Sequence, residues 1–459
     1  MLTILPIDSG TLDSLMLAIG ILGILLIIGM ALRSIIPLFR RYFIPAALIG
    51  GVIGLAAGPY GFGLVGNDIN STWAAMPGIL ISVVFAPMLM GQELPKFRES
   101  VKVAAPMIVY SYFSSFIIVG IPALLTFFLF TPVFGVNPLF STIFEVSWPG
   151  GHGTAAGMTP AYEDLGWADG GSLALGSATA GLLFGIIGGM IMLNLAAKRG
   201  RLAATRGKAE LKTASDLLPE PDIHSKGRIN KASLDNLALH VTLIAIAILI
   251  GWALKFVVDM VITGVPLFPL AMIGGLIIQL IAKRSGLAPL IDKATMSSIA
   301  GWALDFLVVS AVASISIPVI LDNWVSLLIC LIVVATISLG VFYYLSPRLF
   351  KEDWFEAGIV NFGTCTGVVS VGLLLLRAAD PEMKTDAGRA FALKSPFTSP
   401  FIGGGFVTAL YPILAIRYGN LWLGIGCLVV CALILLAAKI FGLWNSPQRV
   451  RSDSQVYQK

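Results

Sequence analysis

Charged residues are scarce in this chain of 459 residues: they account for 12% of it, whereas hydrophobic residues account for 57%. Soluble globular domains carry roughly 25% charged residues, so the composition excludes an ordinary soluble enzyme and predicts a polytopic membrane protein. The net charge of +5 is concentrated in a few short loops. It therefore indicates how the chain is oriented in the membrane, and we expect no nucleic-acid partner.

Cysteine and histidine are rare as well, with 4 and 3 copies. Cys330, Cys365, Cys427 and Cys431 lie in or beside apolar segments and form neither a disulfide framework nor a zinc-binding spacing. The sequence also lacks paired catalytic aspartates and an H-E-x-x-H motif, so we expect neither an enzyme nor an organic cofactor. Because no Lys or Arg precedes the first apolar run, no cleaved signal peptide is expected.

Long apolar runs dominate what is present. A helix needs roughly 20 apolar residues to cross about 30 Å of hydrocarbon. The sequence predicts such spans at 12–32, 43–60, 75–92, 103–130, 172–197, 236–258, 266–283, 297–319, 324–346, 396–416 and 421–441. Two further apolar stretches, 141–161 and 355–376, are interrupted by glycines and fit either spans or re-entrant hairpins.

Basic loops decide between these two possibilities, because Lys and Arg collect in cytoplasmic loops. The first loop, 33–41, is basic, which places it inside and the N-terminus outside. If 141–161 crossed the membrane, the basic linker 198–235 would lie outside, so we interpret 141–161 as re-entrant. A re-entrant 355–376 likewise keeps the basic loop 377–394 inside, and the C-terminus is then cytoplasmic.

The expected fold is an all-α polytopic membrane protein with two inverted-topology repeats. Each repeat has five transmembrane helices plus a re-entrant hairpin, and because five is odd the halves enter the membrane from opposite sides. FIPAALIGGVIG echoes FPLAMIGGLIIQ, and IFEVSWPGGHGT echoes WFEAGIVNFGTCTG in the same order. The expected domains are the first repeat (1–197), a basic cytoplasmic linker (198–235), the second repeat (236–416) and an extra C-terminal helix with a cytoplasmic tail (417–459).

Each hairpin carries a run of glycines and hydroxyl residues at which a helix must break. Broken helices at membrane depth expose N–H groups that attract carboxylates and carbonyls that bind Na⁺. The alternative is that glycine only permits close helix packing. We favour substrate binding, and the candidate residues are Gly150, Gly151, His152, Gly153, Thr154, Gly363, Thr364, Cys365, Thr366 and Gly367.

Several further polar residues lie in or beside the apolar runs. His152 is expected either to contact substrate or to act as a hydrogen-bonded strut in the hairpin. Asp305 is an intramembrane carboxylate and so a candidate for ion coupling, and the other candidates for this role are Thr154, Thr366 and Ser370. Glu145 and Glu356 are expected at the hairpin entrances and His240 near the interface. SPFTS (395–399) is expected to begin the tenth span.

At GGHGTAAG the chain resembles the bacterial sodium–glutamate symporter family, and the likeness extends to FIPAALIGG and FGTCTGVVSVGLLLLRAADPE. It covers roughly residues 12–416. The resemblance implies Na⁺-coupled uptake of L-glutamate by alternating access across the bacterial plasma (inner) membrane. It also implies a homodimer in which a core domain carrying both hairpins moves against a scaffold. Residue by residue, it points to Gly150 through Thr154 and to Gly363, Thr364 and Gly367.

Two alternatives stay open at this point. The first is a Na⁺- or H⁺-coupled carrier of another small carboxylate, such as a di- or tricarboxylate, because helix N-termini bind carboxylates generally. The second, more remote, is a membrane sensor with a transporter-like body. In each case the expected partners are a small anionic solute and membrane lipid, and the sequence does not assign Na⁺ ligands.

Overall fold

The computed structural model describes residues 9–41, 44–91, 97–199, 202, 236–261, 264–350, 353–381 and 385–445, so most of the linker predicted at 198–235 lies outside the described residues. The elements of the first half are α1 (Ser9–Ile35), α2 (Pro37–Arg41), α3 (Ala46–Ala57), α4 (Asn67–Phe85), η1 (Ala86–Leu89), α5 (Phe97–Leu125), η2 (Thr126–Phe130), α6 (Thr131–Phe134), η3 (Pro138–Thr142), α7 (Ile143–Ser147), α8 (Gly151–Gly157), α9 (Thr159–Asp164) and α10 (Gly170–Lys198). Those of the second half are α11 (Asn236–Asp259), α12 (Leu267–Arg284), η6 (Ala288–Leu290), α13 (Lys293–Ala313), α14 (Ile317–Asp322), α15 (Trp324–Leu349), α16 (Trp354–Ala379), α17 (Ala387–Thr398) and α18 (Phe406–Ile440).

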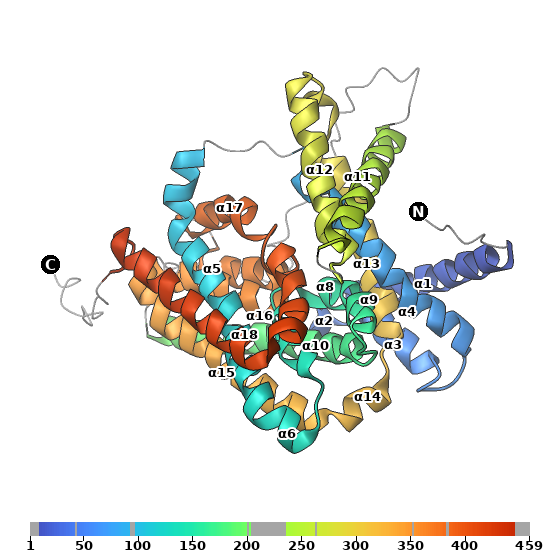
Figure 1. The fold of residues 1–459 in the computed structure, drawn as a ribbon, viewed down its shortest axis with the longest axis horizontal. Coiled ribbons are helices and arrows are strands. Elements are labelled where there is room, and N and C mark those ends of the chain that lie inside the picture. Colours follow the sequence, from blue (N-terminus) through green and yellow to red (C-terminus); the bar gives the residue numbers. More distant parts are fainter. Residues whose placement is uncertain are drawn as a thin grey trace.

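Within the described ranges every regular element is helical, and 10 helices are long and apolar enough to cross a membrane. Helices satisfy their own backbone hydrogen bonds, which is what a lipid environment demands. The predicted all-α polytopic membrane fold is therefore confirmed. Figure 1 shows α8, α10 and α16 in the middle of the molecule, with α1 at one edge and α5, α15 and α18 on the opposite side.

Two of the expected spans differ from the structure. The span expected at 43–60 contains only the 12 residues of α3 in a helix, about 18 Å at 1.5 Å per residue. The span expected at 396–416 is broken, because α17 ends at Thr398 and α18 begins at Phe406. Gly403 (φ +67°) and Gly404 (φ +110°) between them adopt left-handed backbone conformations that a helix cannot contain. After a kink at Gly419 (φ +78°), α18 continues through the predicted eleventh span.

Glycine pairs in α3 and α12 make matching contacts in the two halves. A Cβ atom added at Gly50 would lie 2.6 Å from the Leu25 carbonyl oxygen of α1, and one at Gly274 would overlap the Ala247 carbonyl of α11. Each glycine thus lets its helix approach the preceding helix at backbone distance. Gly50 and Gly274 occupy the same place in the echoed motifs AALIGG and LAMIGG.

The next glycine in each motif contacts the other half of the chain. A Cβ atom at Gly51 would lie 2.6 Å from Val312 Cβ in α13, and one at Gly275 would overlap the Ala86 carbonyl at the end of α4. α4 and α13 are themselves packed together. These crosswise contacts are the ones that two repeats related by a pseudo-twofold axis would make, and they support the inverted repeat as a proposal.

α16 reverses direction in its middle. Gly367 (φ −146°, ψ 36°) and Val368 (φ +63°, ψ 176°) leave the helical conformation. A Cβ atom at Gly363 would then lie 2.8 Å from the Gly372 Cα atom, although nine residues of continuous helix would separate these positions by about 13 Å. The two parts of α16 therefore run back along each other, and both contact α10: Gly185 lies against Thr366, and Gly189 lies against Leu375.

Candidate functional site

Three interruptions of the helical backbone meet in the centre of the structure. We call residues 148–151 the first break, 367–368 the second break and 399–405 the third break. A side chain at Gly151 (φ +68°) would collide with Cγ1 of Val368, which joins the first two breaks. A Cβ atom at Gly403 would lie 3.4 Å from the Pro149 carbonyl oxygen, which joins the third break to the first.

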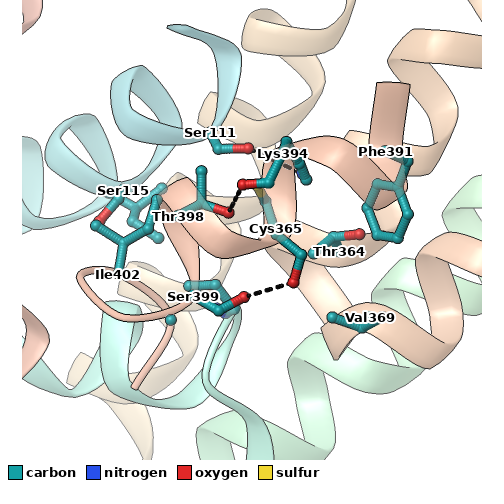
Figure 2. Close-up of a pocket in the computed structure, with 14 residues that line it drawn as sticks. Ser111, Ser115, Thr364, Cys365, Val369, Phe391, Lys394, Thr398, Ser399 and Ile402 are labelled. Carbon is teal, nitrogen blue, oxygen red and sulfur yellow. Dashed lines mark hydrogen bonds between the residues drawn. The ribbon is translucent and has the colours of Figure 1, made fainter. Parts of the chain in front are cut away.

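A cavity lies where the three breaks meet, and it contains about 600 Å³ of space that atoms do not fill, part of it open to the outside. We call it the central cavity (Figure 2). Its wall combines hydroxyl groups, apolar side chains and one amine, and the lining residues are Ser111, Ser115, Ile118, Pro149, Thr364, Cys365, Val369, Phe391, Lys394, Ser395, Thr398, Ser399, Ile402 and Gly403. A mostly apolar wall with a few polar groups is the usual lining of a small-molecule site.

The first-break residues predicted from the sequence lie beside the central cavity and do not line it. Pro149 provides the wall from this break. Gly151 and Gly153 instead sit against other segments: a Cβ atom at Gly153 would lie 2.8 Å from Leu304 Cδ1. Gly150 and Thr154 are in mutual contact, with a hypothetical Gly150 Cβ atom 2.8 Å from Thr154 Cβ. In this structure these glycines permit close packing between segments.

His152 matches the strut alternative. Its side chain is 9% exposed, and its Nε2 atom lies 3.0 Å from the Thr179 hydroxyl of α10. Thr179 donates in turn to the Leu175 carbonyl at 3.1 Å. Because the single hydroxyl hydrogen of Thr179 goes to Leu175, the Thr179 oxygen accepts from His152, whose imidazole then carries its proton on Nε2. The contact fastens α8 to α10 behind the cavity.

Residues beside the second break form part of the cavity wall. Thr364 and Cys365 line the central cavity, whereas Thr366 is buried and donates its hydroxyl hydrogen to the Phe362 carbonyl at 2.8 Å. Gly367 is in close contact, since a Cβ atom there would lie 2.8 Å from Val371 Cγ2. Of the five residues predicted at this break, two therefore face the place where a solute would sit.

Two ion-coupling candidates share a different cavity. Asp305 and Ser370 both line a space of about 1680 Å³ that also borders Arg33 and Arg377, among other residues. We call this the large cavity. Val369 lines the central cavity and its neighbour Ser370 lines the large one. The segment that follows the second break is thus the partition between the two spaces.

Lys394 is the residue that sequence reasoning missed. Its charge was assigned to the cytoplasmic loop 377–394, but the side chain belongs to α17 and is only 3% exposed. It lines the central cavity and donates hydrogen bonds to Ser111 Oγ at 2.9 Å and to Asn361 Oδ1 at 2.5 Å. The motif SPFTS, which follows Lys394 directly, was expected to begin a span, but its residues 395–398 are the end of α17.

The glutamates expected at the hairpin entrances are buried instead, Glu145 with 0% and Glu356 with 2% of its surface exposed. Glu145 Oε1 accepts hydrogen bonds from Ser115 Oγ at 2.9 Å, from the Gly403 backbone at 2.8 Å and from Thr408 Oγ1 at 3.2 Å. The carboxylate therefore holds the third break against α5. The three hydrogen bonds to Oε1 compensate part of the desolvation of this buried carboxylate.

His240 is also buried by protein. Its Nδ1 atom lies 2.7 Å from the Asn236 carbonyl, and its Nε2 atom accepts from the Asp292 backbone N–H at 2.8 Å. It joins α11 to the start of α13.

Comparison with known families gives one match. A family model described as "Sodium/glutamate symporter" matches residues 9–368. The matched segment contains the first two breaks and ends before α17, Lys394 and the third break. A comparison with curated protein sequences gives no match.

Proposed function

The chain belongs to the sodium/glutamate symporter family, and from this premise we propose that it couples Na⁺ entry to the uptake of L-glutamate across a bacterial inner membrane. Membership in a transporter family and 10 apolar helices make it a membrane transporter and not a member of an enzyme class. The observation that carries the proposal is the central cavity, where three interrupted helices meet. Interrupted helices at membrane depth are the usual way in which a secondary transporter presents backbone to solute and ion.

The second break supplies donors for an anion. After Val368 the helix restarts, and the first N–H groups of a helix have no acceptor within it. Val369, in that first turn, lines the central cavity. Together with the positive end of the helix dipole, these N–H groups favour a carboxylate. The hydroxyls of Thr364 and Ser399 add polar partners from two directions (Figure 2).

We propose that transport proceeds by alternating access around the second break. The central cavity and the large cavity lie on the two sides of the Val369–Ser370 step. The segment around Val369 and Ser370 would move together with the first break, because Gly151 contacts Val368. This movement would expose the bound solute first to one cavity and then to the other. Asp305 and Ser370 face the large cavity and are the candidates for the Na⁺ that accompanies the solute; Thr154 and Thr366 stay candidates from inside the packed breaks.

We further propose a homodimer with the N-terminus outside and the C-terminus in the cytoplasm. The orientation is supported by the basic loops, since Arg33 and Arg377 border the same large cavity and positive loops stay inside.

A second candidate function is a Na⁺- or H⁺-coupled carrier of a di- or tricarboxylate. It is favoured by one observation: α17 and the third break, which form much of the cavity wall, lie beyond the residues that match the family model. The family match therefore gives no information on the part of the cavity wall that α17 and the third break contribute, and this part would help to select the solute.

Uptake by purified protein in liposomes tests both candidates. Labelled L-glutamate, L-aspartate and L-malate are offered with an inward Na⁺ gradient, with Na⁺ replaced by choline, and with a pH gradient alone, beside protein-free liposomes. We expect glutamate uptake that requires the Na⁺ gradient. Malate uptake in place of glutamate would establish the second candidate, and no gradient-driven uptake of any carboxylate would overturn both.

A further inference from the structure

Lys394 is a buried cation without an anionic partner. Of the ion pairs that the described residues could form, one is found, between Lys255 and Asp259. An unpaired ammonium inside a protein costs several kcal/mol through lost hydration. Such a cost is tolerated where a charge has a function. Among the described residues, the groups that accept hydrogen bonds from Lys394 are neutral dipoles, and none is a carboxylate.

The neighbours of Lys394 hold its position and leave donor capacity unused. An ammonium has three N–H donors, and two of them go to Ser111 Oγ and Asn361 Oδ1. Asn361 is oriented by a hydrogen bond from its own Nδ2 to the Ala357 carbonyl at 2.7 Å. The Phe391 ring lies under the charge, with its centroid 4.7 Å from Nζ.

Lys394, Ser111 and Phe391 all line the central cavity (Figure 2). The buried carboxylate of Glu145 contacts α5 one helical turn away from Lys394: Ser111 bonds Lys394, and Ser115 bonds Glu145. The two charges are thus held apart by adjacent turns of one helix and are not joined to each other.

We propose that Lys394 binds a carboxylate group of the transported solute and so makes the central cavity selective for anions. This inference rests on the proposed transport function and names a residue outside the family-matched segment. Ser111 and Asn361 act as positioning residues that aim the ammonium. The described residues that line the central cavity include no arginine. The anion is therefore held by the single charge of Lys394 and by neighbouring hydroxyls, and not by the paired N–H groups of a guanidinium.

The alternative is that Lys394 only ties α17 to α5 and α16. A structural tie would affect all ligands equally, whereas a carboxylate-binding charge affects only ligands that carry that carboxylate. L-glutamine lacks the side-chain carboxylate of glutamate, and isoglutamine lacks the α-carboxylate, while both keep the size of glutamate. Comparing the three ligands therefore separates the two roles.

The test measures equilibrium binding of these three amino acids, and of malate and citrate, to purified protein in the presence of Na⁺. The variants are Lys394→Gln, Lys394→Arg and Asn361→Asp, with Lys283→Gln at the exposed end of α12 as the matched control. Asn361→Asp keeps Lys394 in place but gives it an internal carboxylate at the position of Oδ1. It remains informative if Lys394→Gln does not fold.

We expect wild type to bind glutamate at least tenfold more tightly than one of the two amides. A hydrogen bond to a charged group corresponds to roughly 10- to 100-fold in affinity. In Lys394→Gln and Asn361→Asp, glutamate should lose that factor and bind like the amide, while Lys394→Arg keeps part of it and Lys283→Gln all of it. Equal weakening of all three amino acids, or unchanged discrimination, would overturn the role of Lys394.

Failure of the transport proposal would look different. If wild type binds malate or citrate but not glutamate, the glutamate assignment fails, and loss of that binding in Asn361→Asp still supports Lys394 as the anion-binding residue. If wild type binds none of these carboxylates, the Lys394 inference is wrong, whatever the uptake of other solutes shows.

Discussion

Gly151 and Val368 come from different breaks, both have left-handed φ angles, of +68° and +63°, and they are in direct contact. Gly151 has no side chain, and the space that one would need is taken by Cγ1 of Val368. The contact couples the first break to the second, so that the two segments cannot move past each other without separating here.

The first prediction concerns Gly151→Ala. The added methyl group would collide with Val368, and an alanine at φ +68° would itself be strained by about 1–2 kcal/mol. We expect glutamate uptake to fall at least tenfold while membrane insertion persists. Gly340→Ala is the control, because nothing lies within 4 Å of a Cβ atom there. If Gly151→Ala transports like wild type, the contact has no part in the cycle.

The second prediction concerns Val368→Gly. A β-branched residue at φ +63° and ψ 176° occupies a region that is essentially restricted to glycine, at a cost of about 1–3 kcal/mol. Glycine would remove this strain but lose more entropy on folding, by about 1 kcal/mol. We expect unchanged or higher thermal stability in detergent, and reduced uptake because the contact with Gly151 is lost. A large drop in the melting temperature would show that the valine side chain stabilises the break.

The third prediction distinguishes the charge of Glu145 from its hydrogen bonds. Glu145→Ala would leave the two buried hydroxyl donors and the partly buried Gly403 N–H without this acceptor, at about 1–3 kcal/mol for each buried donor. We expect it to lower the melting temperature clearly, whereas Glu145→Gln keeps an acceptor oxygen at the Oε1 position and should be much less affected. Thermal unfolding of both variants gives the comparison, and equal destabilisation would indicate that the negative charge itself is required.

The fourth prediction concerns ion coupling at Asp305. Its side chain lines the large cavity beside Ser370. If Asp305 contributes to a Na⁺ site, Asp305→Asn should raise the Na⁺ concentration for half-maximal uptake at least tenfold, with a smaller change in glutamate affinity. Asp322→Asn, at the end of α14, provides a control carboxylate. An unchanged Na⁺ dependence would move the coupling ion elsewhere.

The fifth prediction uses a residue outside the membrane spans. Asp292 caps α13: its Oδ2 accepts from the Thr295 hydroxyl at 2.6 Å and from the Thr295 backbone N–H at 2.9 Å. The hydroxyl bond, followed by the backbone bonds, holds the pKa of Asp292 below its usual value. A lowered folded-state pKa stabilises the protein above the unfolded-state value of about 3.9, and this contribution is lost as the pH falls through the folded-state pKa.

Asp292→Ala should therefore be less stable than wild type at pH 7 by about 0.5–2 kcal/mol, the usual contribution of a helix cap. The difference should narrow as the pH is lowered below about 4. Thermal unfolding at several pH values measures it, and a difference independent of pH would show that the charge of Asp292 does not contribute.

The membrane fold could be predicted because it follows from composition and length: an apolar run that cannot meet water must be a helix. The first two breaks could be found for the same reason, since Gly150, Gly151 and Gly367 are conspicuous in such runs. The third break was not predicted, because SPFTS was interpreted as the start of a span and the glycines at 403–405 follow it within a stretch that is otherwise apolar.

The lining of the site could not be predicted from the chain alone. Lys394 has the same sequence context as the loop cations before it. It differs from them only in the folded protein, where α17 brings its side chain into contact with Ser111 and Asn361. The burial of Glu145 could not be predicted because its partners Ser115, Gly403 and Thr408 come from distant parts of the sequence. Buried polar pairs of this kind depend on tertiary contacts, which local patterns do not encode.

The crosswise glycine contacts have a consequence for how the protein is made. Gly51 rests on Val312, and Gly275 rests on Ala86, so each half completes the packing of the other. During synthesis the first half must wait in the bilayer with Gly51 unpacked until α13 has been inserted. The core around Gly51 is therefore completed late in synthesis, by residues that lie about 260 positions further along the chain.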